Sequence, residues 1–215
     1  MSSTSTHRLR DLAQILFFAL VVRPFVTLFI GLRVRGRNRL PRRDPFILIA
    51  NHSSHLDTVS LLSLFPLGRL RSIHPCAAAD YFGRTRLIAS FSHTFFNILP
   101  IARVKITPET NPVRTMREAL GRGESLILYP EGTRGSGESM AAFKTGITHL
   151  LEEVPDVPIV PAYLVNMGRS LPKGEYLPVP FICEVRIGAP RLVHGTRKEV
   201  IEALERSVLE LRDEG

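Results

Sequence analysis

A run of five apolar residues at positions 46–50 (FILIA) stops abruptly at the polar stretch 51–57 (NHSSHLD). The run predicts a buried strand. The segment that follows, residues 56–65, is mostly apolar and ends before Pro66, which predicts a short helix. The polar stretch therefore lies at the C-terminal end of a strand, the place where α/β folds carry their functional residues.

The same alternation of apolar runs and helical segments continues along the chain. Further strands are predicted at residues 73–79, 97–102, 125–129, 157–165 and 181–187. Helices are predicted at residues 84–95, 112–121, 141–153 and 196–212. Because 215 residues without an internal repeat fit one domain, we expect a single α/β domain with a mixed, mostly parallel sheet flanked by helices.

The N-terminal part of the chain is its most apolar stretch. Residues 12–22 are apolar apart from Gln14, and residues 25–32 continue the run after Arg23-Pro24. A membrane-spanning helix needs about 20 continuous apolar residues, and proline disfavours a helical conformation in the residue before it. We therefore expect two short helices that lie in one leaflet, with residues 1–33 as a membrane-associating hairpin and 34–215 as the main domain. The alternative is that these helices pack only on their own domain.

Positive charge is concentrated beside this stretch. The net charge is +8, and nine of the arginines lie in the first 43 residues, where Asp11 is the one acid. Such asymmetry indicates an anionic partner. The sequence carries no nucleic-acid-binding motif, and its aromatic residues lie in apolar runs. We therefore expect an anionic membrane surface as the partner, with a peripheral or monotopic protein at its cytoplasmic face.

Metal and redox chemistry are not indicated. The two cysteines, Cys76 and Cys183, both lie in apolar runs and are expected to be reduced core residues. The seven histidines show no ligand spacing with cysteine, so no metal site is predicted.

Two interpretations of the polar stretch compete. In the first, Ser54 caps the helix and Asp57 completes a capping box, which needs no catalysis. In the second, Asp57 binds one nitrogen of His52 and leaves the other as a general base. Residues five apart on a regular helix point about 140° away from each other, so this pair can meet only if the chain bends between them. A strand-to-helix junction supplies such a bend, and the spacing alone leaves both interpretations open.

The spacing Asn51-His52, four residues, Asp57 resembles the HX4D motif of the 1-acylglycerol-3-phosphate acyltransferase (PlsC-like) family of glycerolipid acyltransferases. Further segments resemble the other motifs of that family in the same order. They are residues 97–103 (NILPIAR), 129–134 (YPEGTR), 143–146 (FKTG) and 157–161 (VPIVP). The resemblance covers roughly residues 34–190 and also implies an N-terminal helical pair.

The resemblance implies transfer of a fatty acyl group to the free hydroxyl of a lysophospholipid, with 1-acylglycerol-3-phosphate giving phosphatidic acid. The acyl donor would be acyl-CoA or acyl carrier protein, and no further cofactor is expected. His52 would be the catalytic base and Asp57 would orient it. The chain lacks a G-x-S-x-G nucleophile elbow, so we expect direct attack without an acyl-enzyme, with Ser53 and Ser54 as caps.

A phosphate site is expected near this base. The glycine-rich loop at 132–135 follows a strand, so its backbone N–H groups can face an anion. Guanidinium groups bind phosphate through paired hydrogen bonds, which predicts a clamp of Arg103 and Arg134. Glu131 would orient an arginine or an acceptor hydroxyl. The full set of predicted substrate-binding residues is Arg103, Lys105, Glu131, Gly132, Thr133, Arg134 and Lys144.

Other functions stay open at this stage. One alternative is an acyltransferase that acts on another lysophospholipid or on an amino-acid lipid. A lipid hydrolase would use His52 to activate water, and a non-catalytic module would only bind anionic lipid.

Overall fold

A seven-stranded sheet forms the centre of the computed structural model, which describes residues 3–43, 45–79, 86–103, 106–108, 110–135, 140–172, 174–175, 177–179 and 181–214. The strand order is β1-β7-β6-β2-β5-β3-β4. The strands are β1 (Arg33–Arg35), β2 (Ile47–Ala50), β3 (Ile73–Ala78), β4 (Leu99–Ile101), β5 (Ser125–Leu128), β6 (Ile159–Val165) and β7 (Glu184–Ile187). All neighbouring pairs are parallel except β6 and β7. The predicted α/β domain with a mixed, mostly parallel sheet is confirmed.

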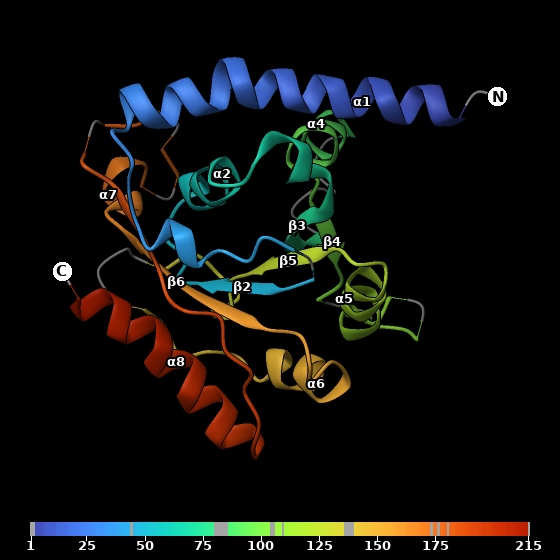
Figure 1. Cartoon of the computed structure of the whole chain (residues 1–215), viewed down its shortest axis with the longest axis vertical. Coiled ribbons are helices and arrows are strands. Elements are labelled where there is room, and N and C mark those ends of the chain that lie inside the picture. Colours follow the sequence, from blue (N-terminus) through green and yellow to red (C-terminus); the bar gives the residue numbers. More distant parts are fainter. Residues whose placement is uncertain are drawn as a thin grey trace.

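Helices cover both faces of the sheet (Figure 1). One face carries α2 (His55–Ser63) and α4 (Arg86–Phe96), and the N-terminal helix lies across both of them. The opposite face carries α5 (Pro112–Gly121), α6 (Gly146–Glu153) and α8 (Arg197–Asp213). Shorter helical segments are η3 (Arg37–Arg39), η4 (Leu67–Ser72) and α7 (Met167–Ser170).

Strand β2 is buried on both faces, which explains the uninterrupted apolar run that encodes it. Side chains alternate between the two faces of a strand. Phe46, Leu48 and Ala50 belong to the core under α2 and the N-terminal helix. Ile47 and Ile49 belong to the core under α5, α6 and α8. The strand that leads to the polar stretch is therefore fixed by packing from both sides.

The N-terminal segment is one continuous helix, so the prediction of a helical pair is wrong. The segments α1 (Ser3–Phe17), η1 (Phe18–Val22) and η2 (Phe25–Phe29) follow one another as a single rod (Figure 1). The Arg23 N–H donates to the Phe18 carbonyl, five residues earlier, in the π-helical pattern. In an α-turn the ring of Pro24 would clash with the carbonyl four residues before it. The wider π-turns accommodate the proline without ending the helix.

This helix is held to the domain by its inner face. Phe17 and Phe18 pack against the aromatic rings of α4, including Phe96. Gln14 Nε2 donates to a carbonyl of α4 at 3.0 Å, and the Arg23 guanidinium donates to the carbonyl of residue 65 at 2.7 Å. The helix thus lies along the surface of the domain over most of its length.

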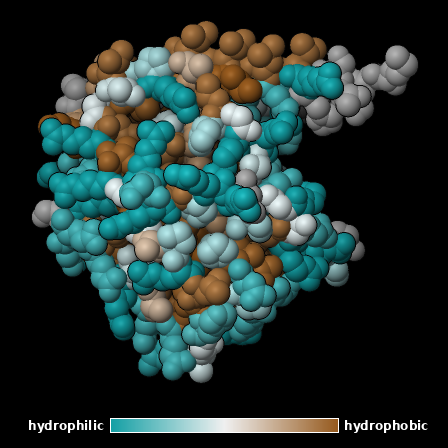
Figure 2. Space-filling view, in the orientation of Figure 1, coloured by the Kyte–Doolittle hydropathy of each residue, from teal (hydrophilic) through white to brown (hydrophobic). Residues whose placement is uncertain are grey.

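The outer face of the same helix is apolar and exposed. The large apolar side chains on this face are Leu9, Leu12, Leu16, Leu20, Val21, Leu28 and Phe29. Figure 2 shows them as a hydrophobic band along the helix, above a largely hydrophilic surface. Within the described part of the chain, Arg8–Phe29 is one helix of 22 residues that is long and apolar enough to cross a membrane, by length and composition only.

Strand β1 was not among the strands predicted from the sequence. It pairs in parallel with β7, with Arg33 opposite Glu184. The chain then turns at Gly36, whose φ of +72° is in the left-handed region. A Cβ atom at this position would lie 2.3 Å from the Ile187 carbonyl oxygen, so the close approach to β7 requires glycine.

Candidate active site

The polar stretch after β2 folds into a bend that brings His52 and Asp57 together. His52 Nδ1 lies 2.8 Å from Asp57 Oδ2. The Asp57 side chain is fully buried, whereas 19% of the His52 side chain is exposed. The imidazole is therefore open to a substrate on one side and bound to a carboxylate on the other.

The contacts required by the two competing interpretations of this stretch are both present. Ser54 is the N-cap of α2, and Asp57 completes a capping box with it. Asp57 Oδ2 accepts the backbone N–H of Ser53 at 2.7 Å and that of Ser54 at 2.9 Å, in addition to the contact with His52. The start of a helix is also a favourable place for negative charge. The capping interaction therefore positions the carboxylate that binds the imidazole.

Tyr129 packs against one face of the His52 imidazole. Its ring stacks on that of His52, with centroids 4.0 Å apart and planes inclined by 17°. The Tyr129 hydroxyl lies 2.9 Å from Thr58 Oγ1 on α2. Burial, with a contribution from the nearby Asp57 carboxylate, raises the pKa of Tyr129, so the hydroxyl stays protonated. The ring plane of His52 is thus fixed by an aromatic side chain to which sequence reasoning gave no role.

Glu131 braces the loop that carries His52. Its Oε1 accepts the His52 N–H at 2.7 Å, and its Oε2 accepts the Ala141 N–H at 2.7 Å. The side chain is buried, and burial raises the pKa of Glu131, against the lowering effect of these two hydrogen bonds. Within the described residues, the hydrogen bonds of Glu131 are thus with two backbone amides, and none is with an arginine; its predicted contact with an acceptor hydroxyl stays a prediction.

The glycine-rich loop closes over the same region, although its amides are only partly available. The Gly132 N–H donates to the Tyr129 carbonyl and the Gly135 N–H to the His52 carbonyl, both at 2.9 Å. These two amides do not face an anion, contrary to the prediction for the loop as a whole. Among the described residues, the amides of Thr133 and Arg134 have no hydrogen-bond partner.

Lys144 lies against the glycine-rich loop. Gly132 has a φ of +76°, and a Cβ atom there would lie 2.8 Å from Lys144 Nζ. The Lys144 N–H also donates to the Pro130 carbonyl at 2.9 Å. The ammonium group therefore lies next to the loop. Helix α6 begins at Gly146 instead of the predicted residue 141, because the amides of Ala141 and Lys144 donate to Glu131 and Pro130.

The two predicted clamp arginines occupy different places. Arg134 is half-buried, and its charge, second to burial, lowers the pKa of His55, which places it beside the His52 loop. Arg103 is exposed beyond β4 at the far edge of the sheet. Three strand spacings of about 4.8 Å separate β4 from β2, or roughly 14 Å. Lys105 lies outside the described residues.

The described residues contain no group of three or more histidine, cysteine or acidic side chains that could hold a metal ion. Cys76 and Cys183 are free and buried, and burial raises the pKa of both thiols.

Known proteins share both the sequence pattern and the fold. The family model described as Acyltransferase matches residues 31–165. The chain is 25% identical to 1-acyl-sn-glycerol-3-phosphate acyltransferase LPAT1, chloroplastic, of Arabidopsis thaliana, over 80% of this chain and 46% of that protein. It is 27% identical to the human 1-acyl-sn-glycerol-3-phosphate acyltransferase alpha, over 81% of this chain and 60% of that protein. The chain thus spans about half the length of these relatives.

The fold is that of a solved bacterial structure. The 1-acyl-sn-glycerophosphate (LPA) acyltransferase PlsC from Thermotoga maritima superposes with a TM-score of 0.75 and 20% sequence identity, over 97% of this chain and 82% of that one. The family match runs from β1 to the end of β6 and contains His52, Asp57, Tyr129 and Glu131. Since it covers more than half of the sequence and all the strands that build this site, the chain belongs to the Acyltransferase family.

Proposed function

We propose that this protein is a 1-acylglycerol-3-phosphate O-acyltransferase, which moves a fatty acyl group from acyl-CoA or acyl carrier protein to the free hydroxyl of the acceptor and forms phosphatidic acid. The observation that carries the proposal is the His52–Asp57 pair, 2.8 Å apart at the end of a buried strand. Membership of the family and the names of the relatives support the same reaction.

His52 acts as the general base. Asp57 binds Nδ1, so Nε2 takes the proton of the acceptor hydroxyl while the hydroxyl oxygen attacks the thioester carbonyl. The tetrahedral intermediate collapses, the C–S bond breaks, and the leaving thiolate receives the proton from the imidazolium. The buried Asp57 carboxylate stabilises the positive charge that the ring carries between these steps.

The acyl group passes directly between the substrates. Ser54 does not serve as a nucleophile, because its hydroxyl donates to the Leu171 carbonyl at 2.8 Å and accepts the Leu56 N–H at 3.2 Å. The acceptor is therefore the nucleophile that His52 activates.

Cationic groups beside the base hold the acceptor phosphate. Arg134 belongs to the glycine-rich loop and Lys144 lies against it, and the amides of Thr133 and Arg134 add donors for a phosphate oxygen. Arg103 and Lys105 are kept in the proposal as further cations that contribute to binding of the acceptor. Binding energy from the phosphate then positions the hydroxyl at His52.

The N-terminal helix associates with the membrane as a monotopic or peripheral element, so residues 1–33 serve as the membrane-associating part and 34–215 as the catalytic domain. The helix packs along the domain through its inner face, which aligns the exposed leucine face with the plane of a leaflet. The arginines that follow the helix favour an anionic, cytoplasmic surface.

The test is an assay of the purified protein with one labelled acyl donor and a panel of acceptors, with products identified by mass. Acylated lysophosphatidic acid is expected, and free fatty acid without acylated lipid would instead indicate a hydrolase. The same assay then compares Arg134→Ala and Arg103→Ala on lysophosphatidic acid and on monoacylglycerol.

Arg134→Ala is expected to raise KM and lower kcat/KM for the phosphorylated acceptor by roughly 10- to 100-fold, the usual scale for a hydrogen bond to a charged group. The loss on monoacylglycerol should be much smaller. Arg117→Ala is the control, because this arginine lies on α5 and pairs with Glu153 at 2.7 Å. Equal losses on both acceptors would rule out the phosphate assignment.

A further inference from the structure

We infer that Leu177, Val179, Phe181 and Ile182 form a second membrane-docking segment, which enters an anionic leaflet beside the N-terminal helix and thereby presents the His52 loop to acceptor lipid. The inference rests on the proposed function. It starts from an unusual exposure of apolar side chains between α7 and β7. The exposed fractions are 83% for Leu177, 52% for Val179, 42% for Phe181 and 59% for Ile182.

The segment is held in place, so its apolar side chains are presented outward by a defined backbone. The Val179 N–H donates to the Ser170 carbonyl at 2.7 Å, and Ser170 Oγ donates to the Val179 carbonyl at 2.8 Å. At the other end, Asn166 Nδ2 donates to the Ile182 carbonyl at 3.1 Å. Contacts at both ends anchor the segment to α7 and the residue before it, and leave its side chains without cover from the described part of the domain.

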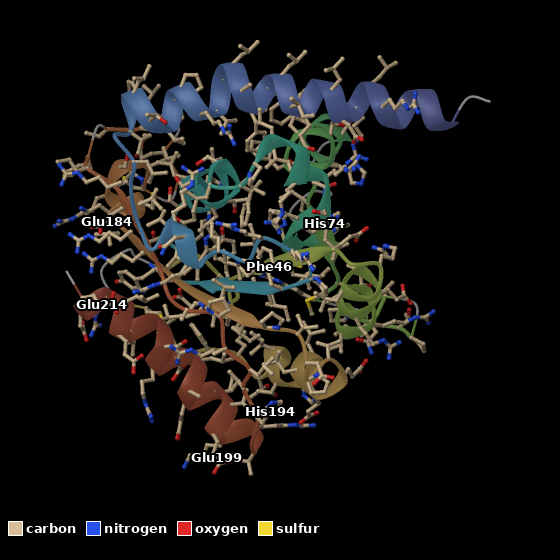
Figure 3. The ribbon with its side chains drawn as sticks, viewed as in Figure 1. Phe46, His74, Glu184, His194, Glu199 and Glu214 are labelled. Atoms are coloured by element: carbon tan, nitrogen blue, oxygen red, sulfur yellow. The ribbon has the colours of Figure 1, made fainter. Side chains whose placement is uncertain are left out.

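The segment ends beside the N-terminal helix. The Arg33 N–H, two residues after the helix ends in a turn at Gly31, donates to the Cys183 carbonyl at 2.9 Å. Leu28 and Phe29, at the end of that helix, are exposed. Figure 3 shows Glu184, the first residue of β7, on the side of the molecule where the helix ends. The two apolar elements therefore come together at one edge of the domain.

Positive charge lies where the docking segment meets the N-terminal helix, and it favours an anionic partner. Arg33 is exposed at this junction, and the neighbouring Arg35 remains 62% exposed although it binds Glu184. Apolar side chains beside arginines match the boundary of an anionic leaflet, where insertion and charge both contribute. A lipid surface is favoured over a protein partner because the acceptor itself resides in the bilayer.

The part of the chain that anchors the segment is hydrogen-bonded to the polar stretch that contains His52. Ser54 Oγ, at the N-cap of the helix that bears Asp57, donates to the Leu171 carbonyl at 2.8 Å. Leu171 directly follows α7, the helix to which the segment is anchored. Docking of the segment would thus hold the site at a fixed height above the leaflet, within reach of a hydroxyl at the glycerol level.

The experiment compares wild type with the variant Leu177→Ser/Ile182→Ser in flotation with vesicles of equal parts phosphatidylglycerol and phosphatidylcholine. Binding is expected to weaken at least about tenfold, since two large apolar side chains lose their burial in lipid. Leu192→Ser is the matched control, because Leu192 is 51% exposed in the loop before α8. It should bind as wild type does.

Activity separates this inference from the proposed function. The double variant should lose activity on acceptor embedded in vesicles and keep kcat/KM for a monomeric short-chain acceptor in water. A wild type that acylates neither acceptor would contradict the proposed function, while flotation would still test the segment. Should the double variant be poorly folded by circular dichroism, Leu177→Ser alone gives the same comparison at the most exposed position.

Two outcomes would overturn the inference. One is unchanged flotation of a folded variant. The other is a wild-type dimer, seen by light scattering, that the variant converts to a monomer with vesicle binding intact, because the segment would then join two copies of the chain.

Discussion

The ring of Tyr129 lies flat on the imidazole of His52, with the centroids 4.0 Å apart and the planes 17° apart. Asp57 binds the same imidazole at Nδ1, at 2.8 Å. One contact fixes which nitrogen is left for the substrate, and the other fixes the plane in which it points. The stacking contact joins two neighbouring parallel strands, since β2 leads to His52 and β5 leads to Tyr129, whereas Asp57 lies in the first turn of α2.

Two variants of Tyr129 should separate the stacking of its ring on His52 from the contact of its hydroxyl with Thr58. Tyr129→Leu removes the stacked ring, and kcat should fall about 2- to 10-fold with little change in KM, since an aromatic pair contributes about 0.5–1.5 kcal/mol. Tyr129→Phe keeps the ring and loses only the hydroxyl contact with Thr58, so its kcat should stay near wild type. Steady-state kinetics and thermal unfolding check both variants. A Tyr129→Phe enzyme as slow as Tyr129→Leu would show that the hydroxyl, and not the stacking, matters.

Removal of the base should abolish most turnover. His52→Ala is expected to lower kcat by roughly 10²–10⁴-fold, the usual contribution of general acid–base catalysis. Asp57→Asn keeps an acceptor for the backbone amides of Ser53 and Ser54 but removes the charge that stabilises the imidazolium, so its loss should be similar or smaller. His55→Ala is the control and should remain active. An inactive His55→Ala beside an active His52→Ala would show that the wrong histidine was assigned.

A variant of Glu131 tests the two hydrogen bonds by which this side chain connects the backbone at His52 to the backbone at Ala141. A glutamine can accept only one of the two backbone N–H groups that the carboxylate accepts, those of His52 and Ala141. Leaving a buried donor unpaired costs about 1–3 kcal/mol, so Glu131→Gln should lower the free energy of unfolding by that amount and also reduce kcat. Denaturant titration and kinetics measure the two effects. The control is Glu153→Gln, where a surface ion pair with Arg117 is worth at most about 1 kcal/mol.

The stability of the fold should depend on pH through three of its histidines. Burial lowers the pKa of His55, His74 and His93 below the usual value of about 6.5. As the pH falls through 6.5 toward the lower folded-state values, the unfolded chain binds more protons than the folded one, so the free energy of unfolding decreases. Urea titrations at pH 7.5 and pH 5.5 test this expectation. His74→Gln should weaken the pH dependence, and a dependence that His74→Gln leaves unchanged would exclude a contribution from this residue.

The parts of the site that lie close together in the sequence were predictable. Residues 46–57 contain the strand, the bend, the cap and the base with its carboxylate, so local rules for strands and helix caps suffice to place them. The capping box and the His52–Asp57 contact were treated as alternatives, although one carboxylate oxygen makes both. Asp57 Oδ2 accepts three donors at once, which a pairwise interpretation of the motif does not anticipate.

Contacts between distant parts of the chain were not predictable from local patterns. Tyr129 meets His52 because of the register between β5 and β2, and Glu131 meets Ala141 because the chain returns after ten residues. Strand β1 has two exposed arginines in three residues and exists because β7 supplies its partner. The N-terminal helix continues past Pro24 because π-turns remove the clash on which the prediction relied.

The pairing of β1 with β7 sets an order for the assembly of the chain. The Arg39 guanidinium donates to the Ile187 carbonyl across a separation of 148 residues, so this contact can form only after β7 has been made. Closing so long a loop is entropically costly and slow. The N-terminal helix precedes both of its partners in the order of synthesis, so its aromatic inner face is uncovered until α4 has been made and its end is untethered until β7 follows. In that interval the most apolar segment of the chain lacks its partners in the domain, and a membrane surface or a chaperone can cover it.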